Sequence, residues 1–266
     1  MSGRTSASAY DAARAEGRAA LVGYLPAGFP SYDGCVTALT AMVEAGVDIV
    51  EVGLPYSDPV IDGPVIQAAA DIALHNKTRT TDVLRTVEAV AATGAGVVVM
   101  TYWNPVLRYG VDAFARDLAA AGGAGLITPD LIPEEADEWM AASEAHELER
   151  IFLVAPSSSD DRIASTVGAC RGWVYAASTM GVTGARSATS AVAPGLVARV
   201  RAAGDLPVGV GLGVSNGEQA AEVASYADGV IVGSAFVRPL LEQPGEAGVK
   251  AVAALAADLA AGVRRR

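Results

Sequence analysis

The sequence predicts an α/β fold, a (β/α)8 or TIM barrel, on three observations. Short runs rich in β-branched residues alternate with longer alanine-rich amphipathic runs, the order expected of parallel strands joined by helices. The alternation repeats roughly eight times, as in a closed barrel. No linker or change of composition divides the chain, so residues 1–266 are expected to form one domain. An open doubly wound sheet is the structural alternative.

Each expected strand is a short apolar run next to glycine, proline or charged residues. In order, the strands are expected at residues 21–27, 48–55, 96–103, 124–130, 150–156, 172–178, 207–214 and 228–236.

The segments between the strands carry apolar residues at helical spacing. Gly46, Gly122 and Gly204 end three of them, as glycine often ends a helix. Between the second and third strands there is room for an extra helix besides residues 80–94. Residues 1–18 are expected to be a polar tail and an additional N-terminal helix, not a signal peptide. Other expected helices are residues 36–46, 111–122, 133–146, 195–204 and 217–227.

The composition excludes several classes of partner. A formal net charge of −11 argues against nucleic acid and against an anionic membrane. No apolar run reaches the length of a membrane span. Cys35 and Cys170 are the only cysteines, and two isolated thiols fit the reducing cytoplasm.

Glu51 places a carboxylate in the middle of an apolar strand, and Asp62 lies in the loop that follows. Alternation puts Glu51 on one face with Ile49, while the neighbouring valines suit the helix layer. Glu51 is therefore expected to point into the barrel mouth, where such barrels carry their active sites. Burial of an unpaired carboxylate costs several kcal/mol. The alternative is that a buried partner neutralises Glu51 for structural reasons.

Glycine-rich turns follow the sixth, seventh and eighth strands. Glycine permits close approach of backbone N–H groups to a ligand, and these loops often bind phosphate in (β/α)8 enzymes. The amides around Gly184, Gly213, Gly233 and Ser234 are expected to hold a dianion without lysine. Each glycine alone would also fit an ordinary tight turn.

The remaining residues restrict the chemistry. Lys77 and Lys250 are the only lysines and neither lies at a strand end, which disfavours a Schiff base. His75 and His146 lie in helical patterns, so no metal site is expected. Carboxylates, tyrosines and backbone amides remain, and general acid–base catalysis is their natural use.

Aromatic side chains predict an apolar end to the pocket. Tyr24, Tyr102 and Tyr175 fall on the first, third and sixth strands, and Leu153 and Leu212 add aliphatic faces. Together with a phosphate site, they suggest an aryl sugar-phosphate as substrate. For each tyrosine, ordinary core packing is the alternative.

The segment EVGLPYSDPVIDGP, residues 51–64, closely resembles the signature of the tryptophan synthase α subunit. The resemblance implies a lyase of tryptophan biosynthesis that cleaves indole-3-glycerol phosphate into indole and glyceraldehyde 3-phosphate. It implies a β subunit that carries pyridoxal phosphate, an αββα heterotetramer in the cytoplasm, and no cofactor in this chain. Further matching segments are residues 24–30, 100–105, 129–135, 152–163, 178–186, 209–215 and 230–237.

The resemblance also implies roles for individual residues. Glu51 resembles the catalytic acid–base and Asp62 the second carboxylate, which would accept a hydrogen bond from the indole N–H. Tyr175 and Thr183 would flank the substrate.

Three residues depart from the family pattern. Ile61 replaces a common alanine, Ile132 a common proline and Phe29 a common aspartate. Ile132 lies in a segment that the resemblance places against the β subunit, and the Phe29 change also bears on that contact.

Other functions remain as alternatives. An indole-glycerol phosphate synthase or a phosphoribosyl isomerase is also a phosphate-binding barrel, but the ring-closing synthase would be expected to use a strand-end lysine. A free-standing lyase and a non-catalytic activator of a β subunit are the others.

Overall fold

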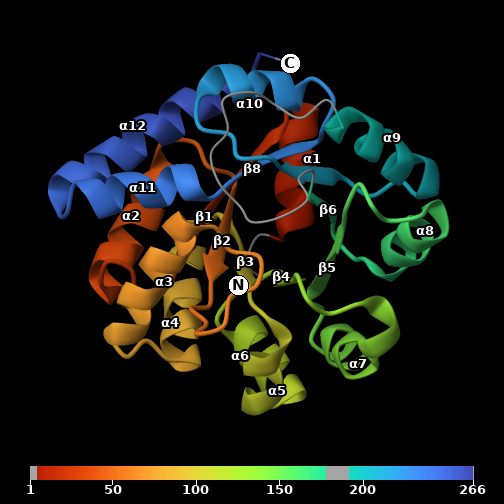
Figure 1. The fold of residues 1–266 in the computed structure, drawn as a ribbon, viewed down its shortest axis with the longest axis horizontal. Helices are drawn as coiled ribbons and strands as arrows, with labels where there is room; N and C mark the ends of the chain where they lie inside the picture. The colour runs from red at the N-terminus through yellow and green to blue at the C-terminus, as the bar shows by residue number, and fades with distance from the viewer. Residues whose placement is uncertain (1–4, 178–191, 266) are drawn as a thin grey trace.

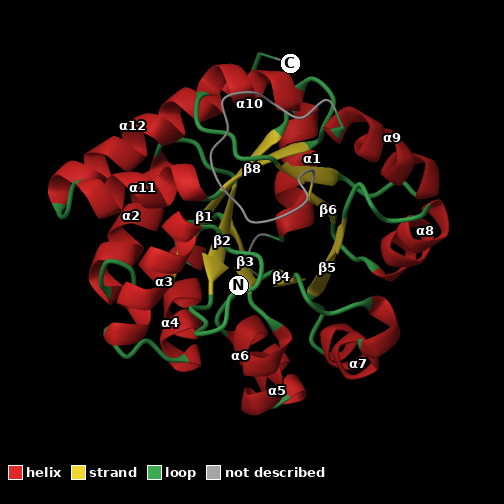
Figure 2. Ribbon diagram, viewed as in Figure 1, coloured by secondary structure: helices red, strands yellow, loops and turns green. Residues whose placement is uncertain are grey.

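A computed structural model describes residues 5–177 and 192–265. Its strands form a closed parallel barrel in chain order, in which β8 pairs with β1 (Figures 1 and 2). The predicted (β/α)8 barrel is confirmed, and the open sheet is excluded. The strands are β1 Ala20–Pro26, β2 Ile49–Gly53, β3 Gly96–Met100, β4 Gly125–Thr128, β5 Glu149–Val154, β6 Val174–Ala177, β7 Val208–Gly211 and β8 Gly229–Val232.

Helices surround the ring of strands (Figure 2). The additional N-terminal helix is α1 Ser6–Ala15, and the extra helix expected between the second and third strands is α3 Pro64–His75. Across the described ranges, no helix is both long and apolar enough to cross a membrane. The other helices are α2 Tyr32–Glu44, α4 Thr80–Ala91, α5 Trp103–Tyr109, α6 Val111–Ala120, η1 Pro133–Glu135, α7 Asp137–Ala145, α8 Asp160–Ala169, α9 Ala193–Ala203, α10 Gly217–Ala224, α11 Ser234–Glu242 and α12 Glu246–Val263.

Most strands are shorter than predicted. The expected third strand, 96–103, ends at Met100, and Trp103 already begins α5. The expected eighth strand, 228–236, ends at Val232, and Ser234 begins α11. In both places the apolar run continues because the residues after the strand are also buried, so hydrophobicity does not mark the strand end.

The hydrophobic core has two layers. Val50 and Val52 of β2 lie in the outer layer, between strands and helices. Ile49 lies in the inner layer, which fills the barrel. The alternation predicted for this strand is therefore confirmed, and Glu51 faces the barrel interior.

Helix α1 fills the amino end of the barrel, where Ala9, Tyr10 and Ala13 join the inner core. Its first turn is held by the carboxylate of Glu149, at the start of β5. This carboxylate accepts hydrogen bonds from the Ser6 hydroxyl and from the backbone N–H groups of Ser6 and Ala7. A negative charge at a helix N-terminus also complements the helix dipole.

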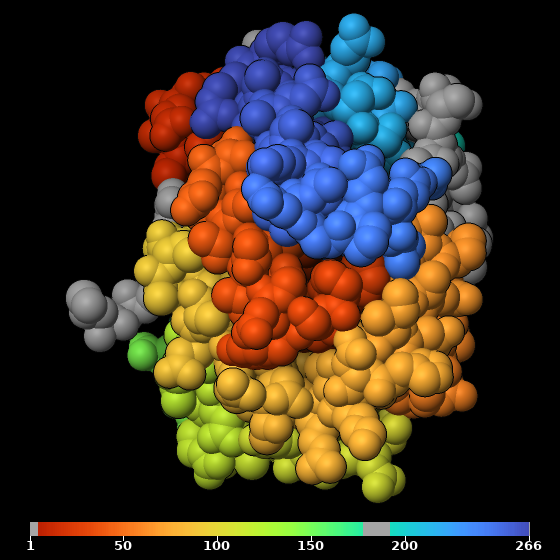
Figure 3. All heavy atoms as spheres, turned by 90° about the vertical axis from the view of Figure 1, so that its left-hand side faces the viewer, coloured from red at the N-terminus to blue at the C-terminus, as the bar shows by residue number. Residues whose placement is uncertain are grey.

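The C-terminal helices complete the outer layer beside the first repeat. Figure 3 shows α12 and α11, in blue, packed against α2 in orange-red. At the end of α12, the Val263 carbonyl accepts a hydrogen bond from Ala19 N–H, next to the start of β1. The last helix therefore anchors the amino end of the barrel.

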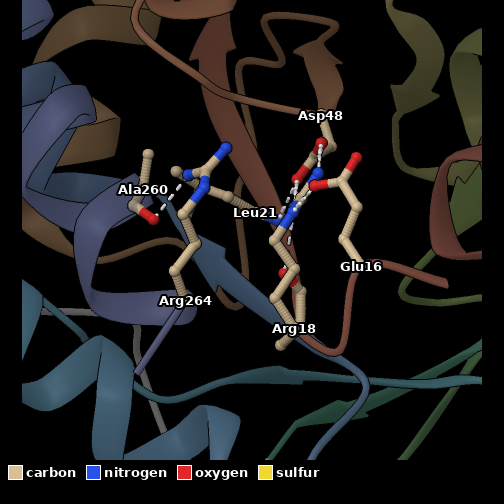
Figure 4. Close-up of polar contacts among 7 residues, drawn as sticks. Glu16, Arg18, Leu21, Asp48, Ala260 and Arg264 are labelled. Carbon is tan, nitrogen blue, oxygen red and sulfur yellow. Dashed lines mark hydrogen bonds and ion pairs between the residues drawn. The ribbon is translucent and has the colours of Figure 1, made fainter. Parts of the chain in front are cut away.

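A buried ion pair joins the segment after α1 to the start of β2 (Figure 4). The Arg18 guanidinium donates to both Asp48 oxygens, over 2.6 and 2.8 Å. Asp48 also accepts from Leu21 N–H over 2.9 Å. The side chains of Arg18 and Asp48 are 7% and 10% exposed. This pair therefore fixes the register of β1 against β2 where the strands begin.

We expect Arg18→Ala to lower the free energy of unfolding by about 3–5 kcal/mol, because it leaves a buried carboxylate without its counter-charge. Urea denaturation at neutral pH measures the loss. Arg85→Ala is the control, since it breaks an exposed ion pair with Asp82 and should cost about 0.5 kcal/mol or less. Equal effects of the two variants would contradict a structural role for the Arg18 pair.

Candidate functional site

A cavity of about 270 Å³ opens at the carboxyl end of the barrel. Strands and loops far apart in the sequence contribute to it, because the barrel brings all strand ends to one rim. The cavity contains nine of the residues that the sequence singled out: Tyr24, Glu51, Asp62, Leu153, Tyr175, Leu212, Gly213, Gly233 and Ser234.

Three predicted residues are not in this group. Tyr102 lies in an adjoining smaller cavity with Tyr24 and Asp62. It was expected on the third strand, but it follows that strand and caps the N-terminus of α5. Thr183 and Gly184 fall outside the described residues.

Glu51 is a buried carboxyl group that faces the cavity. Its side chain is 1% exposed, and its Oε2 has no hydrogen-bond partner among the described residues. Burial, and then the nearby Asp62 charge, raise the pKa of Glu51 to about 8. The alternative that a buried cation neutralises Glu51 finds no support in the described residues, whose ion pairs do not include it.

Asp62 is held by the loop after β2 and by Tyr102. The Tyr102 hydroxyl accepts from Ile61 N–H over 3.1 Å and is hydrogen-bonded to the Asp62 carboxylate. Burial raises the pKa of Asp62 to about 6, and the Tyr102 hydrogen bond opposes that rise. The Tyr56 ring packs on Tyr102, with centroids 5.2 Å apart.

The two carboxyl groups therefore differ in charge near neutral pH. With pKa values of about 8 and about 6, Glu51 is mostly protonated at pH 7 and Asp62 mostly ionised. A site with one proton donor and one fixed anion suits acid–base chemistry, because the environment of each group sets its role.

The opposite side of the cavity is suited to an anion. Gly233 precedes the first residue of α11, Ser234, and both line the cavity. The first N–H groups of a helix lack partners within the helix and attract negative charge. Gly213 has a φ of 72°, a left-handed conformation that favours glycine. No lysine or arginine lines the cavity within the described part of the chain, so neutral amides would provide the binding.

Apolar residues that the sequence analysis did not single out complete the cavity. Met100 ends β3 and Ile231 lies on β8, both near the predicted tyrosines. Inward positions near strand ends could have identified these two residues. The others depend on how loops fold back over the barrel and had no clear signal: Ile61, Ile66, Pro129, Ala155 and Ala177.

The histidines and lysines lie away from the cavity. His75 ends α3, His146 follows α7, Lys77 follows α3 and Lys250 lies on α12. Within the described ranges, no three His, Cys, Asp or Glu side chains are grouped in a way that could hold a metal ion.

Comparisons with known proteins agree in one family. Residues 10–264 match the family model described as tryptophan synthase alpha chain. The chain is 67% identical over 257 residues to the tryptophan synthase alpha chain of Salinispora tropica, covering 96% of each chain. The similar protein of Nocardia farcinica is 64% identical over 258 residues, covering 97% of this chain and 95% of that one. A Mycobacterium tuberculosis tryptophan synthase structure superposes with a TM-score of 0.93 at 61% identity, covering 99% of both chains.

We expect the stability gained by Glu51→Gln over the native chain to increase by several kcal/mol between pH 5 and pH 8. The unfolded chain ionises Glu51 near pH 4.5, whereas the folded chain holds the proton until about pH 8. Native stability is therefore full below pH 4.5 and is lost as pH rises towards 8, by about 1.4 kcal/mol per unit of pKa shift. Urea denaturation at pH 5, 6, 7 and 8 measures the difference between the variants.

Glu88→Gln is the matched control, because Glu88 is an exposed residue on α4. Its stability difference from the native chain should not change over this range. A difference for Glu51→Gln that is equally constant would contradict the raised pKa of Glu51.

Proposed function

The chain belongs to the tryptophan synthase alpha chain family, a lyase of tryptophan biosynthesis, and we propose that Glu51 and Asp62 carry out its cleavage of indole-3-glycerol phosphate. The observation that carries this proposal is the pair of unlike carboxyl groups in one cavity. Glu51 is buried and mostly protonated, and Asp62 is held as an anion.

Glu51 is the proposed proton donor and acceptor. Cleavage of the bond between indole C3 and the glycerol chain needs an electron sink. Protonation of C3 by Glu51 makes the ring that sink, because the bonding electrons then return to the indole as the bond breaks. The same carboxylate takes the proton of the glycerol hydroxyl, which becomes the aldehyde of glyceraldehyde 3-phosphate. Protons and electrons balance, and the carboxyl group is regenerated.

Asp62 is the proposed stabiliser of positive charge on the indole nitrogen. An ionised carboxylate that accepts the ring N–H hydrogen bond interacts more strongly as that charge develops. Tyr102 supports this state, because its hydrogen bond favours the ionised form of Asp62. We infer that Tyr102 acts through Asp62, although the sequence analysis expected it to bind substrate.

The rest of the cavity divides between the two ends of the substrate. Tyr24, Tyr175, Leu153 and Leu212 are the proposed walls for the indole ring. Gly213, Gly233 and Ser234 are the proposed phosphate site, with Thr183 and Gly184 as proposed additions from the segment outside the described residues. The distance between these groups would place Glu51 beside the scissile bond.

A β subunit is the proposed partner. Its family name identifies this chain as one component of tryptophan synthase. Val60, Leu107 and Ile132 follow β2, β3 and β4 and are 72%, 50% and 43% exposed, so apolar surface gathers beside the cavity mouth. We propose an αββα heterotetramer in the cytoplasm, with pyridoxal phosphate in the β subunit and none in this chain. Phe29 is buried and would not touch that partner.

The ring-closing synthase alternative is not favoured by any observation, because both lysines lie away from the cavity. The free-standing lyase and the non-catalytic activator are separated from the proposal by experiment.

We expect Glu51→Gln to reduce indole release about 10²- to 10⁴-fold, the usual contribution of a positioned acid–base group. The amide keeps the shape of the side chain, so binding of indole-3-glycerol phosphate should be retained. Steady-state release of indole and equilibrium binding, both with the β subunit present, measure the two effects. Full activity in this variant would refute the role of Glu51 and would favour an unidentified base.

Asp62→Asn is the companion variant in the same assay. It should lose about 10²- to 10³-fold in rate, because it removes one electrostatic partner of the transition state. An unchanged rate would remove Asp62 from the mechanism while leaving Glu51 in place.

We expect Leu107→Asp to weaken assembly with the β subunit by at least about tenfold in dissociation constant, since a charge would be buried in the apolar contact. Analytical ultracentrifugation of the two subunits together measures assembly. Ile72→Asp is the control, because Ile72 is a comparably exposed apolar residue near the end of α3, away from the cavity mouth.

Two results would contradict the partner proposal. Equal weakening by both variants would show that the contact is elsewhere. Absence of any complex, together with full activity of the isolated chain, would indicate a free-standing lyase.

A further inference from the structure

Three aromatic rings form a continuous column inside the barrel. Tyr10 of α1 packs on Trp173, the residue before β6, with centroids 5.5 Å apart. Trp173 in turn stacks on Tyr175 of β6, with centroids 5.8 Å apart and planes 26° from parallel. Tyr175 lines the cavity, whereas Tyr10 lies in the helix that fills the amino end. The column therefore connects the base of the barrel to the wall of the site.

Glycines on the neighbouring strands make room for this column. A Cβ at Gly209 would lie 2.8 Å from the Trp173 ring, and one at Gly211 would lie 2.6 Å from the Tyr175 hydroxyl. Both distances are too short for ordinary contacts, so the two rings pack directly against the β7 backbone. The sequence analysis interpreted the glycine-rich seventh strand through ligand approach, but these two glycines serve aromatic packing.

Trp173 is also fixed by hydrogen bonding. Its Nε1 donates to the Ser6 hydroxyl over 2.9 Å, and that hydroxyl donates to the Glu149 carboxylate. Glu149 is held by Ala7 N–H over 2.9 Å. Trp173 and Ser6 are both fully buried. With the ring packed on its face and its edge bonded, the indole plane of Trp173 has one favoured orientation.

We propose that Trp173 is a positioning residue for the lyase reaction. Its ring, fixed by Ser6 and by the β7 backbone, sets the plane and depth of the Tyr175 ring in the cavity. Tyr175 then presents a fixed face to the aryl group of the substrate. The proposal rests on the proposed function in one respect, the contact of Tyr175 with the substrate.

The proposal differs from a purely structural role in what it predicts for kinetics. A core residue that only stabilises the fold changes the fraction of folded enzyme, and the folded molecules then have an unchanged KM. A residue that orients a substrate-binding ring changes KM in molecules that remain folded. Ring position is determined across one aromatic contact, so the effect on binding should be moderate.

The test compares Trp173→Phe and Ser6→Ala with a matched control, Trp139→Phe. Trp139 is the other fully buried tryptophan, but it lies in the outer core on α7. Indole release from indole-3-glycerol phosphate is measured with the β subunit present, together with Tm by circular dichroism. We expect Trp173→Phe to raise KM about two- to tenfold, and Ser6→Ala to raise it about twofold, with smaller changes in kcat.

Trp139→Phe should lower Tm by a similar amount and leave KM unchanged. An unchanged KM in Trp173→Phe and in Ser6→Ala would overturn the proposal, and so would an equal rise in all three variants. If Trp173→Phe does not fold, Ser6→Ala decides, since it removes only one hydroxyl group. Failure of the proposed function would be seen separately, as a native chain that releases no indole.

Discussion

The pairing of β8 with β1 closes the barrel, and the arrangement of the site depends on that closure. It brings Glu51 of β2, Tyr175 of β6 and the start of α11 to one rim, although they are separated by more than half of the chain. It also removes water from the interior, which is the condition that raises the pKa of Glu51. An open sheet built from the same strands would provide neither the common rim nor the dry carboxyl group.

The site combines a destabilising group with a framework that tolerates it. A carboxyl group without a partner costs free energy on burial, and native proteins retain such groups mainly where chemistry needs them. The opposite end of the barrel contains the compensating contacts, in which Arg18 and Glu149 are satisfied by several partners each. Stability and reactivity are thus assigned to different ends of the same strands.

The sequence predicted the barrel and most of the cavity, because alternation along each strand and the order of elements are local properties. It identified the face of Glu51 from two neighbouring valines. It did not predict the strand ends, since buried loops continue the apolar runs of β3 and β8. The contacts of Tyr102, and the packing of aromatic rings against Gly209 and Gly211, join distant segments and depend on the folded geometry. The order of the two carboxyl pKa values also required the three-dimensional burial of each group.

Both described ends of the chain lie at the same pole of the molecule. Ser6 contacts Glu149 at the start of β5, and Val263 bonds to Ala19 beside the start of β1, while the cavity opens at the far pole. A tether attached through either end would therefore hold the molecule on a sensor chip with its mouth facing the solution. Immobilised in that orientation, it would present its reactive face to small molecules and to other proteins alike.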